Sequence, residues 1–399
     1  MADSRATPRL LPASKLTAAS RIVVKIGSRL LVHPDSGTLH EVWLEALADD
    51  VAAFRARGQE VVLVSSGAIA LGRRELALPP GPLRLEVSQA AAAVGQIRLA
   101  HAYREALGRR DVRVSQVLLT IDDSENRRRY LNARNTLSTL MRLGTVSVIN
   151  ENDTVATAEI RYGDNDRLAA RVAQMMSADC LVLLSDVGGL YTGDPRRDAT
   201  ATLIPEVTEI DEKIAAMAGG AGTGDGSGGM VTKIAAAQIA HAAGCHTVIA
   251  NGRVDHPLRA IEDCAPCTWF VPSATPRAAR KQWIAGSLEP IGTVTVDAGA
   301  ARALDAGKSL LPAGVVKVEG TFQRGDSVIV RDPDGAALGR GLCAYSIEDA
   351  RRIMGHKSCD IEALLGYRGR DEMIHRDDLV LSGLRPVAGP MAEMTDGDA

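Results

Sequence analysis

The chain has 399 residues, of which 46% are hydrophobic and 24% are charged. This composition can form sizeable buried cores, the length suggests two or three domains, and a disordered or collagen-like chain is excluded. The 46 Lys and Arg residues almost balance the 49 Asp and Glu residues, and the net charge of −3 excludes a strong overall attraction to nucleic acid or to anionic membranes.

From Arg21 to about Pro272, short β-branched segments alternate with longer amphipathic segments. We expect strands at residues 21–27, 60–67, 112–120, 145–150, 180–186 and 245–252, and helices at residues 40–57, 88–107, 124–143, 165–176 and 230–243. Strands that are apolar on both faces and separated by helices predict an α/β domain with three layers (αβα) and a mainly parallel sheet. Ligands of such sheets bind beyond the carboxyl ends of the strands.

The pattern changes after Pro272. Residues 273–290 contain two prolines and several small residues, which is typical of a linker. Beyond it, closely spaced strands are expected at residues 293–297, 315–320, 326–332 and 338–346, with one helix at residues 346–353. The sequence therefore predicts a small, mostly β, barrel-like second domain over residues 291–380. We expect residues 1–20 and 385–399 to be flexible.

The cysteines and the N-terminal residues indicate the compartment. Six scattered cysteines form no disulfide scaffold in so long a chain and fit a reducing environment. Cys264 and Cys267 make one isolated CxxC, which chance explains better than zinc or redox chemistry. Residues 1–20 lack the apolar run of a signal peptide, and the chain has no stretch of about 18 uncharged apolar residues. A cytoplasmic protein without a membrane partner is expected.

Polar groups follow the first two strands. Lys25 stands close to Gly27 and Ser28, where backbone N–H groups and a fixed charge can meet an anion. Taken alone, an ordinary surface lysine is the better interpretation. The segment SSGA at residues 65–68 closes the second strand and leads into a helix start, which is equally consistent with an anion site and with a plain turn.

A dense group of carboxylates and amides follows the fourth strand, in residues 150–153 and 163–166. Helix capping accounts for one such residue and not for the whole set. The group can bind an ammonium group or hold Mg²⁺, because hard cations favour oxygen ligands. Ser185 and Asp186 end the fifth strand, where an Asp can also simply cap a turn.

The glycine-rich segment at residues 219–229 leads into a helix that has Lys233 in its first turn. Such a loop can surround a nucleotide phosphate, and a lysine placed against its helix dipole suggests a nearby anion; a flexible linker is the alternative. Residues 224–229 match GxGxxG but do not follow a strand, so they give little support for a dinucleotide site. The HRD triplet at residues 375–377 lacks the companion motifs of protein kinases.

Together these motifs resemble the glutamate 5-kinase family of the amino acid kinase superfamily, followed by a PUA-type module, from Arg21 to about Asp378. The signatures are VVKIGS, VLVSSGAIALG, AAVGQ, LNARNTL, VINENDTVATAEI, GDNDRLAA, LLSDVGGLYTGDP, SGGMVTKIAAA and SLLPAGVVKVEGTFQRGD. The segment INENDTVATAE with GDND is the most specific of them. The resemblance implies an amino acid kinase-like domain over residues 21–272 and a PUA-like domain over residues 291–380.

The resemblance also implies an activity. ATP and L-glutamate would give ADP and L-glutamyl 5-phosphate, the first step of proline biosynthesis, with feedback inhibition by proline. The residues carried over by position are the catalytic Lys25, Lys233 and Asp186, with Asp186 holding both lysines in register; the ATP-binding Lys25, Ser185, Asp186, Ser227, Gly228, Gly229, Met230, Val231, Thr232 and Lys233; and the glutamate-binding Ser66, Asp153 and Asn165, with Asn150, Asp164 and Asp166 beside them. Mg²⁺ would be held mainly through the ATP phosphates.

The sequence departs from the family at a few positions. Ser65, Ser185 and Ser227 stand where threonine is common, and each keeps a hydroxyl group. The N-terminal extension has no counterpart. The family implies a homodimer or homotetramer and a glutamate-5-phosphate reductase that receives the labile product.

Two alternatives are retained. Another member of the superfamily would phosphorylate aspartate, N-acetylglutamate, carbamate or a nucleoside monophosphate, although the NENDTVATAE segment favours free glutamate. Alternatively, the PUA-like domain would bind RNA. Residues 291–380 contain 12 Lys and Arg residues against 14 Asp and Glu residues and few aromatic residues, so they lack the usual electrostatic and stacking features of an RNA-binding surface.

Overall fold

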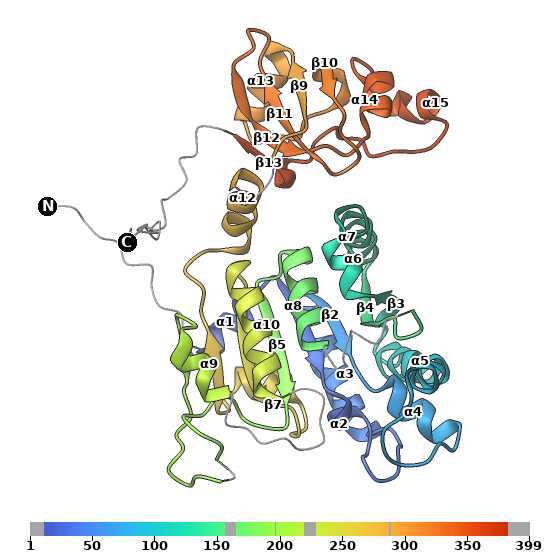
Figure 1. Ribbon diagram of the computed structural model, residues 1–399, viewed down its shortest axis with the longest axis vertical. Helices are drawn as coiled ribbons and strands as arrows, with labels where there is room; N and C mark the ends of the chain where they lie inside the picture. The colour runs from blue at the N-terminus through green and yellow to red at the C-terminus, as the bar shows by residue number, and fades with distance from the viewer. Residues whose placement is uncertain (1–11, 156–164, 196, 219–228, 287–288, 382–399) are drawn as a thin grey trace, which may run out of the picture. The chain divides into compact units, whose positions relative to one another are not determined.

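The computed structural model describes residues 12–155, 165–195, 197–218, 229–286 and 289–381. These residues form two compact units, which divide between Pro276 and Arg277 (Figure 1). Each unit has its own hydrophobic core.

The first unit is built on one eight-stranded sheet with the order β3-β4-β2-β1-β5-β7-β8-β6. The strands are β1 (Arg21–Ile26), β2 (Glu60–Ser65), β3 (Arg113–Leu119), β4 (Thr145–Glu151), β5 (Cys180–Ser185), β6 (Glu206–Val207), β7 (His246–Asn251) and β8 (Cys267–Phe270). Strands β3, β4, β2, β1, β5 and β7 pair in parallel, whereas β8 is antiparallel to β7. The predicted mainly parallel sheet is confirmed.

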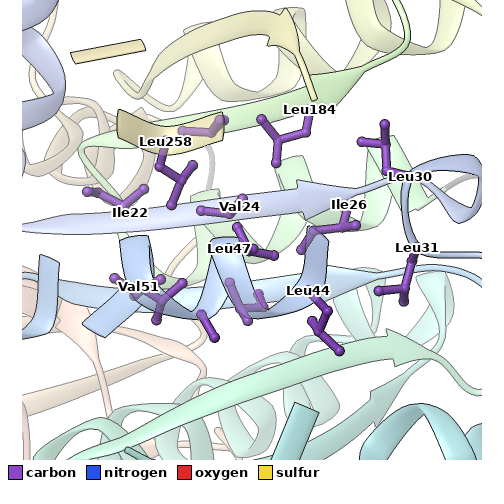
Figure 2. Packing of buried hydrophobic residues seen from close by; sticks show 14 of the residues in the cluster. Ile22, Val24, Ile26, Leu30, Leu31, Leu44, Leu47, Val51, Leu184 and Leu258 are labelled. Carbon is purple, nitrogen blue, oxygen red and sulfur yellow. The ribbon is translucent and has the colours of Figure 1, made fainter. Parts of the chain in front are cut away.

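Helices cover both faces of this sheet. They are α1 (Pro12–Ala18), α2 (Ser28–Leu31), α3 (Glu41–Ala56), α4 (Ala68–Glu75), α5 (Leu85–Gly108), α6 (Ile121–Glu125), α7 (Arg127–Arg142), α8 (Asn165–Met176), α9 (Glu212–Ala218), α10 (Met230–Ala242) and α11 (Pro257–Glu262). In β1, Ile22, Val24 and Ile26 belong to the core that includes α3, whereas Val23 belongs to the core that includes α8 and α10. Figure 2 shows the first of these cores around β1. The three-layer arrangement follows from this alternation.

Two glycines bring α4 and α5 unusually close together. A Cβ atom at Gly72 would lie 1.7 Å from the carbonyl oxygen of Ala91, and one at Gly95 would lie 1.8 Å from that of Ala68. No side chain fits at either distance, so only glycine permits this packing. The contact places α5 beside the start of α4, directly after the end of β2.

The helix expected over residues 124–143 is two helices. Thr120 caps α6 in a capping box with Asp123, so that α6 begins earlier than expected. Asn126 then ends α6 and caps α7, its side chain accepting from the N–H of Arg129 over 3.2 Å. The prediction of one continuous helix was wrong because Asn126 interrupts it with an extended backbone.

The N-terminal extension, expected to be flexible through residue 20, contains α1. Leu16 is fully buried, and Lys15 Nζ lies 2.7 Å from Oε2 of Glu206. Gln59 Nε2 donates to the carbonyl groups of Leu16 and Ala19, over 3.0 and 2.7 Å. These contacts order the segment, and residues 1–11 lie outside the described part of the chain.

The second unit is mostly β. It contains α12 (Pro276–Gly286), β9 (Gly292–Val296), α13 (Ala298–Asp305), β10 (Val315–Gly320), β11 (Ser327–Arg331), β12 (Ala337–Leu342), α14 (Ile347–Ile353), α15 (Ile361–Leu365) and β13 (Leu379–Leu381), with 3-10 turns at Pro312–Gly314, Ser358–Asp360 and Arg376–Asp378. The sheet order is β10-β9-β11-β12-β13. Only β9 and β11 pair in parallel among its described strands. The predicted small β domain is confirmed.

Helix α12 occupies much of the segment expected to be a linker. An NH2 group of Arg280 lies 2.6 Å from Oδ1 of Asp378, and both side chains are almost fully buried. Arg340 also donates to the carbonyl of Ala285 over 2.9 Å. The segment is therefore packed onto the second unit. In the same region, His375 Nδ1 accepts from the N–H of Asp377, so the HRD triplet forms an ordinary turn.

A Leu16→Ala variant tests the packing of α1. Removing a fully buried leucine side chain should lower the free energy of unfolding by about 2–5 kcal/mol. Thermal unfolding of the full chain measures the effect. The control is Leu143→Ala, because Leu143 is 62% exposed. Equal midpoints for the two variants would show that α1 does not pack as described.

Candidate active site

The carboxyl ends of four adjacent strands meet at one edge of the sheet. Asn150 is in β4, Ser65 ends β2, Lys25 is in β1 and Ser185 ends β5. The strand order β4-β2-β1-β5 places these residues in a row, and neighbouring strands are about 4.8 Å apart. The residues expected to bind the phosphate-accepting substrate thus lie on one side of Lys25, and those expected to bind the nucleotide lie on the other.

One buried carboxylate joins the two lysines. Asp166 Oδ1 lies 2.7 Å from Lys25 Nζ, and its Oδ2 lies 3.2 Å from Lys233 Nζ. Thr232 Oγ1 donates to the same Oδ2 over 2.7 Å. Asp166 is fully buried and both lysines are about 5% exposed. The group combines two positive charges with one negative charge, so it keeps a net positive charge in a place that excludes water.

Burial and ion pairing oppose each other at this group. Burial alone would raise the pKa of Asp166, but the charges of Lys25 and Lys233, together with hydrogen bonds from Lys25 and Thr232, lower it to about 2. Burial lowers the pKa of Lys233, and Lys25 adds to that effect, whereas Asp166 opposes it. The Asp166 carboxylate therefore favours the charged form of Lys233 beside Lys25.

This geometry corrects one expectation from the sequence. Asp186 was expected to hold both lysines in register, but Asp166 does so. The carboxylate of Asp186 accepts from Ser185 Oγ over 3.3 Å and lies 3.8 Å from an NH2 group of Arg253. Its side chain is 35% exposed. Asp186 directly follows β5, whereas Asp166 lies in the first turn of α8, and the packing of α8 against β1 shows which one reaches the lysines.

A network of amides lies beside the lysine pair. Asn165 Nδ2 donates to Ser66 Oγ over 2.7 Å, to the carbonyl of Ser65 over 3.0 Å and to Asn150 Oδ1 over 3.0 Å. Asn150 Nδ2 in turn donates to Gln96 Oε1 over 2.7 Å. The predicted substrate residues Ser66, Asn150 and Asn165 are therefore brought together. Gln96 was not predicted individually, although it ends the AAVGQ signature.

Asp153 follows β4 in a turn at the same edge of the sheet. Burial raises the pKa of its carboxyl to about 6. A ligand ammonium group would restore the ionised form. This is consistent with the substrate role expected for Asp153.

The nucleotide side of the row includes the start of α10. Gly229 is the N-cap of this helix, Met230 and Val231 follow it, and Lys233 lies in its first turn. A lysine in a first turn is opposed by the helix dipole, and here Asp166 compensates for it. Asp164, Ser227 and Gly228 lie outside the described residues.

Neither a metal cluster nor a membrane helix is found in the described part of the chain. No group of three or more His, Cys, Asp or Glu side chains there could hold a metal ion. No described helix is long and apolar enough to span a membrane. Asp166, the most buried carboxylate at this edge, is engaged by Lys25 and Lys233.

Comparisons with protein families agree with this architecture. Residues 20–251 match the model of the amino acid kinase family, and residues 292–365 match the model of the PUA domain. The sheet, the lysine pair and these matches define a phosphoryl-transfer protein of the amino acid kinase class with an added PUA domain.

Two relatives of known activity give a more specific comparison. The glutamate 5-kinase of Paramagnetospirillum magneticum is 64% identical over 93% of this chain and 100% of its own length. That of Rhodospirillum rubrum is 62% identical over 90% of this chain and 96% of its own length. The chain therefore belongs to the amino acid kinase family and, within it, to the glutamate 5-kinases.

An Asp166→Asn variant tests the role of the carboxylate that joins Lys25 and Lys233. Asparagine keeps the shape of Asp166 but removes the negative charge that pairs with two buried lysines, so kcat should fall at least about 100-fold. Steady-state kinetics with saturating substrates measure it. Asp186→Asn serves as the comparison and should lower kcat less, because Asp186 is partly exposed. The reverse order would restore the original assignment of Asp186.

Proposed function

We propose that the protein transfers the γ-phosphoryl group of ATP to the γ-carboxylate of L-glutamate, which gives ADP and L-glutamyl 5-phosphate. The relationship to glutamate 5-kinases supports this assignment. The observation that supports it most directly is the buried group of Lys25, Asp166 and Lys233 beside the amide network of Asn150 and Asn165.

The chemistry requires two anions to meet. A γ-carboxylate has a pKa of about 4.3 and is ionised at neutral pH, so it needs no general base. One of its oxygens attacks the γ-phosphorus, and the bond to the ADP oxygen breaks with its electron pair leaving on ADP. Lys25 and Lys233 offset the charge of the transferring group. Asp166 holds the two ammonium groups a fixed distance apart, so they are oriented before the substrates arrive.

ATP fits the nucleotide side of the row. Lys25 and Lys233 would contact its phosphates, and the backbone N–H groups at the start of α10 would donate to them, because helix N-termini favour anions. Mg²⁺, held by the phosphates, would supply further charge neutralisation when bound. Ser185 and Asp186 would lie beside the rest of the nucleotide.

L-Glutamate fits the other side. Its γ-carboxylate would lie next to the lysines, and its α-ammonium group would meet Asp153 and Asn165. Ser66 would hold the middle of the substrate through the hydroxyl that already accepts from Asn165. Burial raises the pKa of Asp153, and a substrate ammonium group beside it would favour the ionised carboxylate.

The remaining roles are proposals from the family resemblance. They comprise feedback inhibition by proline, assembly into a dimer or tetramer, the first step of proline biosynthesis, a cytoplasmic location and delivery of the labile acyl phosphate to a reductase. The balanced charge of residues 291–380 gives no support for RNA as the ligand of the PUA domain.

Hydroxylamine trapping tests the reaction. The purified chain with MgATP should form a coloured hydroxamate with L-glutamate and not with N-acetylglutamate, aspartate or carbamate, because only glutamate combines a free α-ammonium group with a γ-carboxylate at the required distance. Proline should suppress the signal. A signal with one of the other acids instead would keep the phosphate centre but reject the glutamate site.

The pKa of Asp153 predicts a pH dependence. Below about pH 6 its carboxyl becomes protonated in the free protein and no longer attracts the substrate ammonium group. The value of kcat/KM for glutamate should therefore fall as the pH decreases from 7 to 5.5, relative to its value at higher pH.

The matched control for this effect is Asp153→Asn. This variant should have a lower kcat/KM for glutamate than the wild type at every pH. Its kcat/KM should also lack the decrease between pH 7 and 5.5 that protonation of Asp153 causes. Titration of ATP affects both proteins equally. Parallel profiles for the wild type and the variant would contradict the role of Asp153.

A further inference from the structure

Two amides in the network beside the lysine pair each have one atom without a partner. These atoms are Nε2 of Gln96 and Oδ1 of Asn165, and both are excluded from solvent. Neither has a hydrogen-bond partner in the described residues. Buried polar atoms are rarely left without a hydrogen bond in native proteins. Two such atoms beside the proposed substrate site therefore indicate that a ligand bonds to them.

Backbone groups determine which way these amides face. The N–H of Glu151 donates to Asn150 Oδ1 over 2.9 Å, so Asn150 has to present Nδ2 to Gln96. Gln96 must accept that bond with Oε1, which leaves Nε2 as a donor. Likewise, the carbonyl of Ser65 accepts from Asn165 Nδ2 over 3.0 Å, which leaves Asn165 Oδ1 as an acceptor. The free atoms are therefore one donor and one acceptor.

The place of Gln96 in the fold indicates which part of a substrate it meets. Gln96 lies in α5 and reaches Asn150 in β4, and β2 lies between β4 and the strand of Lys25. The γ-carboxylate of glutamate has to lie beside Lys25 for phosphoryl transfer. The other end of the molecule then points toward β4 and Gln96.

The close packing of α4 and α5 brings Gln96 to this position. Gly95 precedes it and lies so near Ala68 that a Cβ atom would be 1.8 Å from the carbonyl oxygen of Ala68. Ala68 begins α4, two residues after Ser66. The glycine thus allows α5 to lie directly against the segment that follows β2, with Gln96 next in sequence.

We propose that Gln96 binds the α-carboxylate of L-glutamate through Nε2, and that it thereby selects a free amino acid as the substrate. An α-carboxylate accepts hydrogen bonds, and the neighbouring α-ammonium group donates one to Asn165 Oδ1. The two free atoms are the complement of this zwitterionic group. The inference rests on the proposed function and adds a specificity residue to it.

The variant Gln96→Glu separates this role from a purely structural one. The substituted side chain keeps an oxygen that accepts from Asn150 Nδ2. In place of the Nε2 donor it has a negatively charged oxygen, which repels the α-carboxylate of the substrate. The KM for L-glutamate should rise about 10- to 100-fold, while kcat stays within about threefold. L-Isoglutamine has a carboxamide in place of the α-carboxylate and keeps a free γ-carboxylate. The substitution should raise the KM for L-isoglutamine much less than the KM for L-glutamate. The preference for glutamate over isoglutamine should therefore fall at least about tenfold.

Two other variants complete the experiment. Gln116→Glu makes the same chemical change at an exposed position in β3 and should leave both KM values unchanged. Gln96→Met removes both polar atoms without adding a charge and should also raise the KM for glutamate at least about tenfold. If Gln96→Glu fails to fold in thermal melting, the methionine variant decides the question.

Several results would overturn the proposal. One is unchanged kinetics of the folded Gln96 variants. The others are a fall in kcat without a change in KM, and an equal rise in KM for glutamate and isoglutamine. Either of these last two results would indicate that Gln96 acts only through Asn150. A wild-type protein that phosphorylates neither acid would reject the proposed function itself, which is a distinct outcome.

Discussion

The candidate active site depends on one buried carboxylate, that of Asp166, placed between two lysines. Two ammonium groups cannot be held together out of water without a compensating charge, and Asp166 supplies it at 2.7 and 3.2 Å. Three strongly charged groups with almost no exposed surface are costly to bury. Lys25, Asp166 and Lys233 together carry one more positive than negative charge. Phosphate groups of a bound nucleotide would balance that charge, which explains why the protein keeps these three charged groups buried.

The secondary structure supports this arrangement from three directions. Lys25 comes from the central strand β1, which is paired on both sides and therefore rigid. Asp166 lies in the first turn of α8, where the helix dipole stabilises a carboxylate. Lys233 lies in the first turn of α10, where the dipole opposes a cation, and depends on Asp166 for compensation. The positions of α8 and α10 on the same face of the sheet bring the three groups together.

Much of the fold could be predicted because it follows from local patterns. The buried β-branched strands and the helix at residues 165–176 agree with the expected elements. Two of the errors occurred where distant residues decide the structure. Lys15 contacts Glu206, and Arg280 contacts Asp378, so α1 and α12 are ordered by partners that lie 191 and 98 residues away in the sequence. In the helix expected over residues 124–143, a single capping residue, Asn126, outweighed a continuous amphipathic pattern.

The sequence by itself predicted the sheet from hydrophobic periodicity, and it predicted the class of protein and the two lysines through motifs that resemble a known family. Only the tertiary structure decided that Asp166 rather than Asp186 joins the lysines, and that Gln96 belongs to the amide network. Both decisions depend on distances between elements far apart in the chain. The packing of α8 beside β1, and the glycine contact between α4 and α5, set those distances, and neither has a local signal in the sequence.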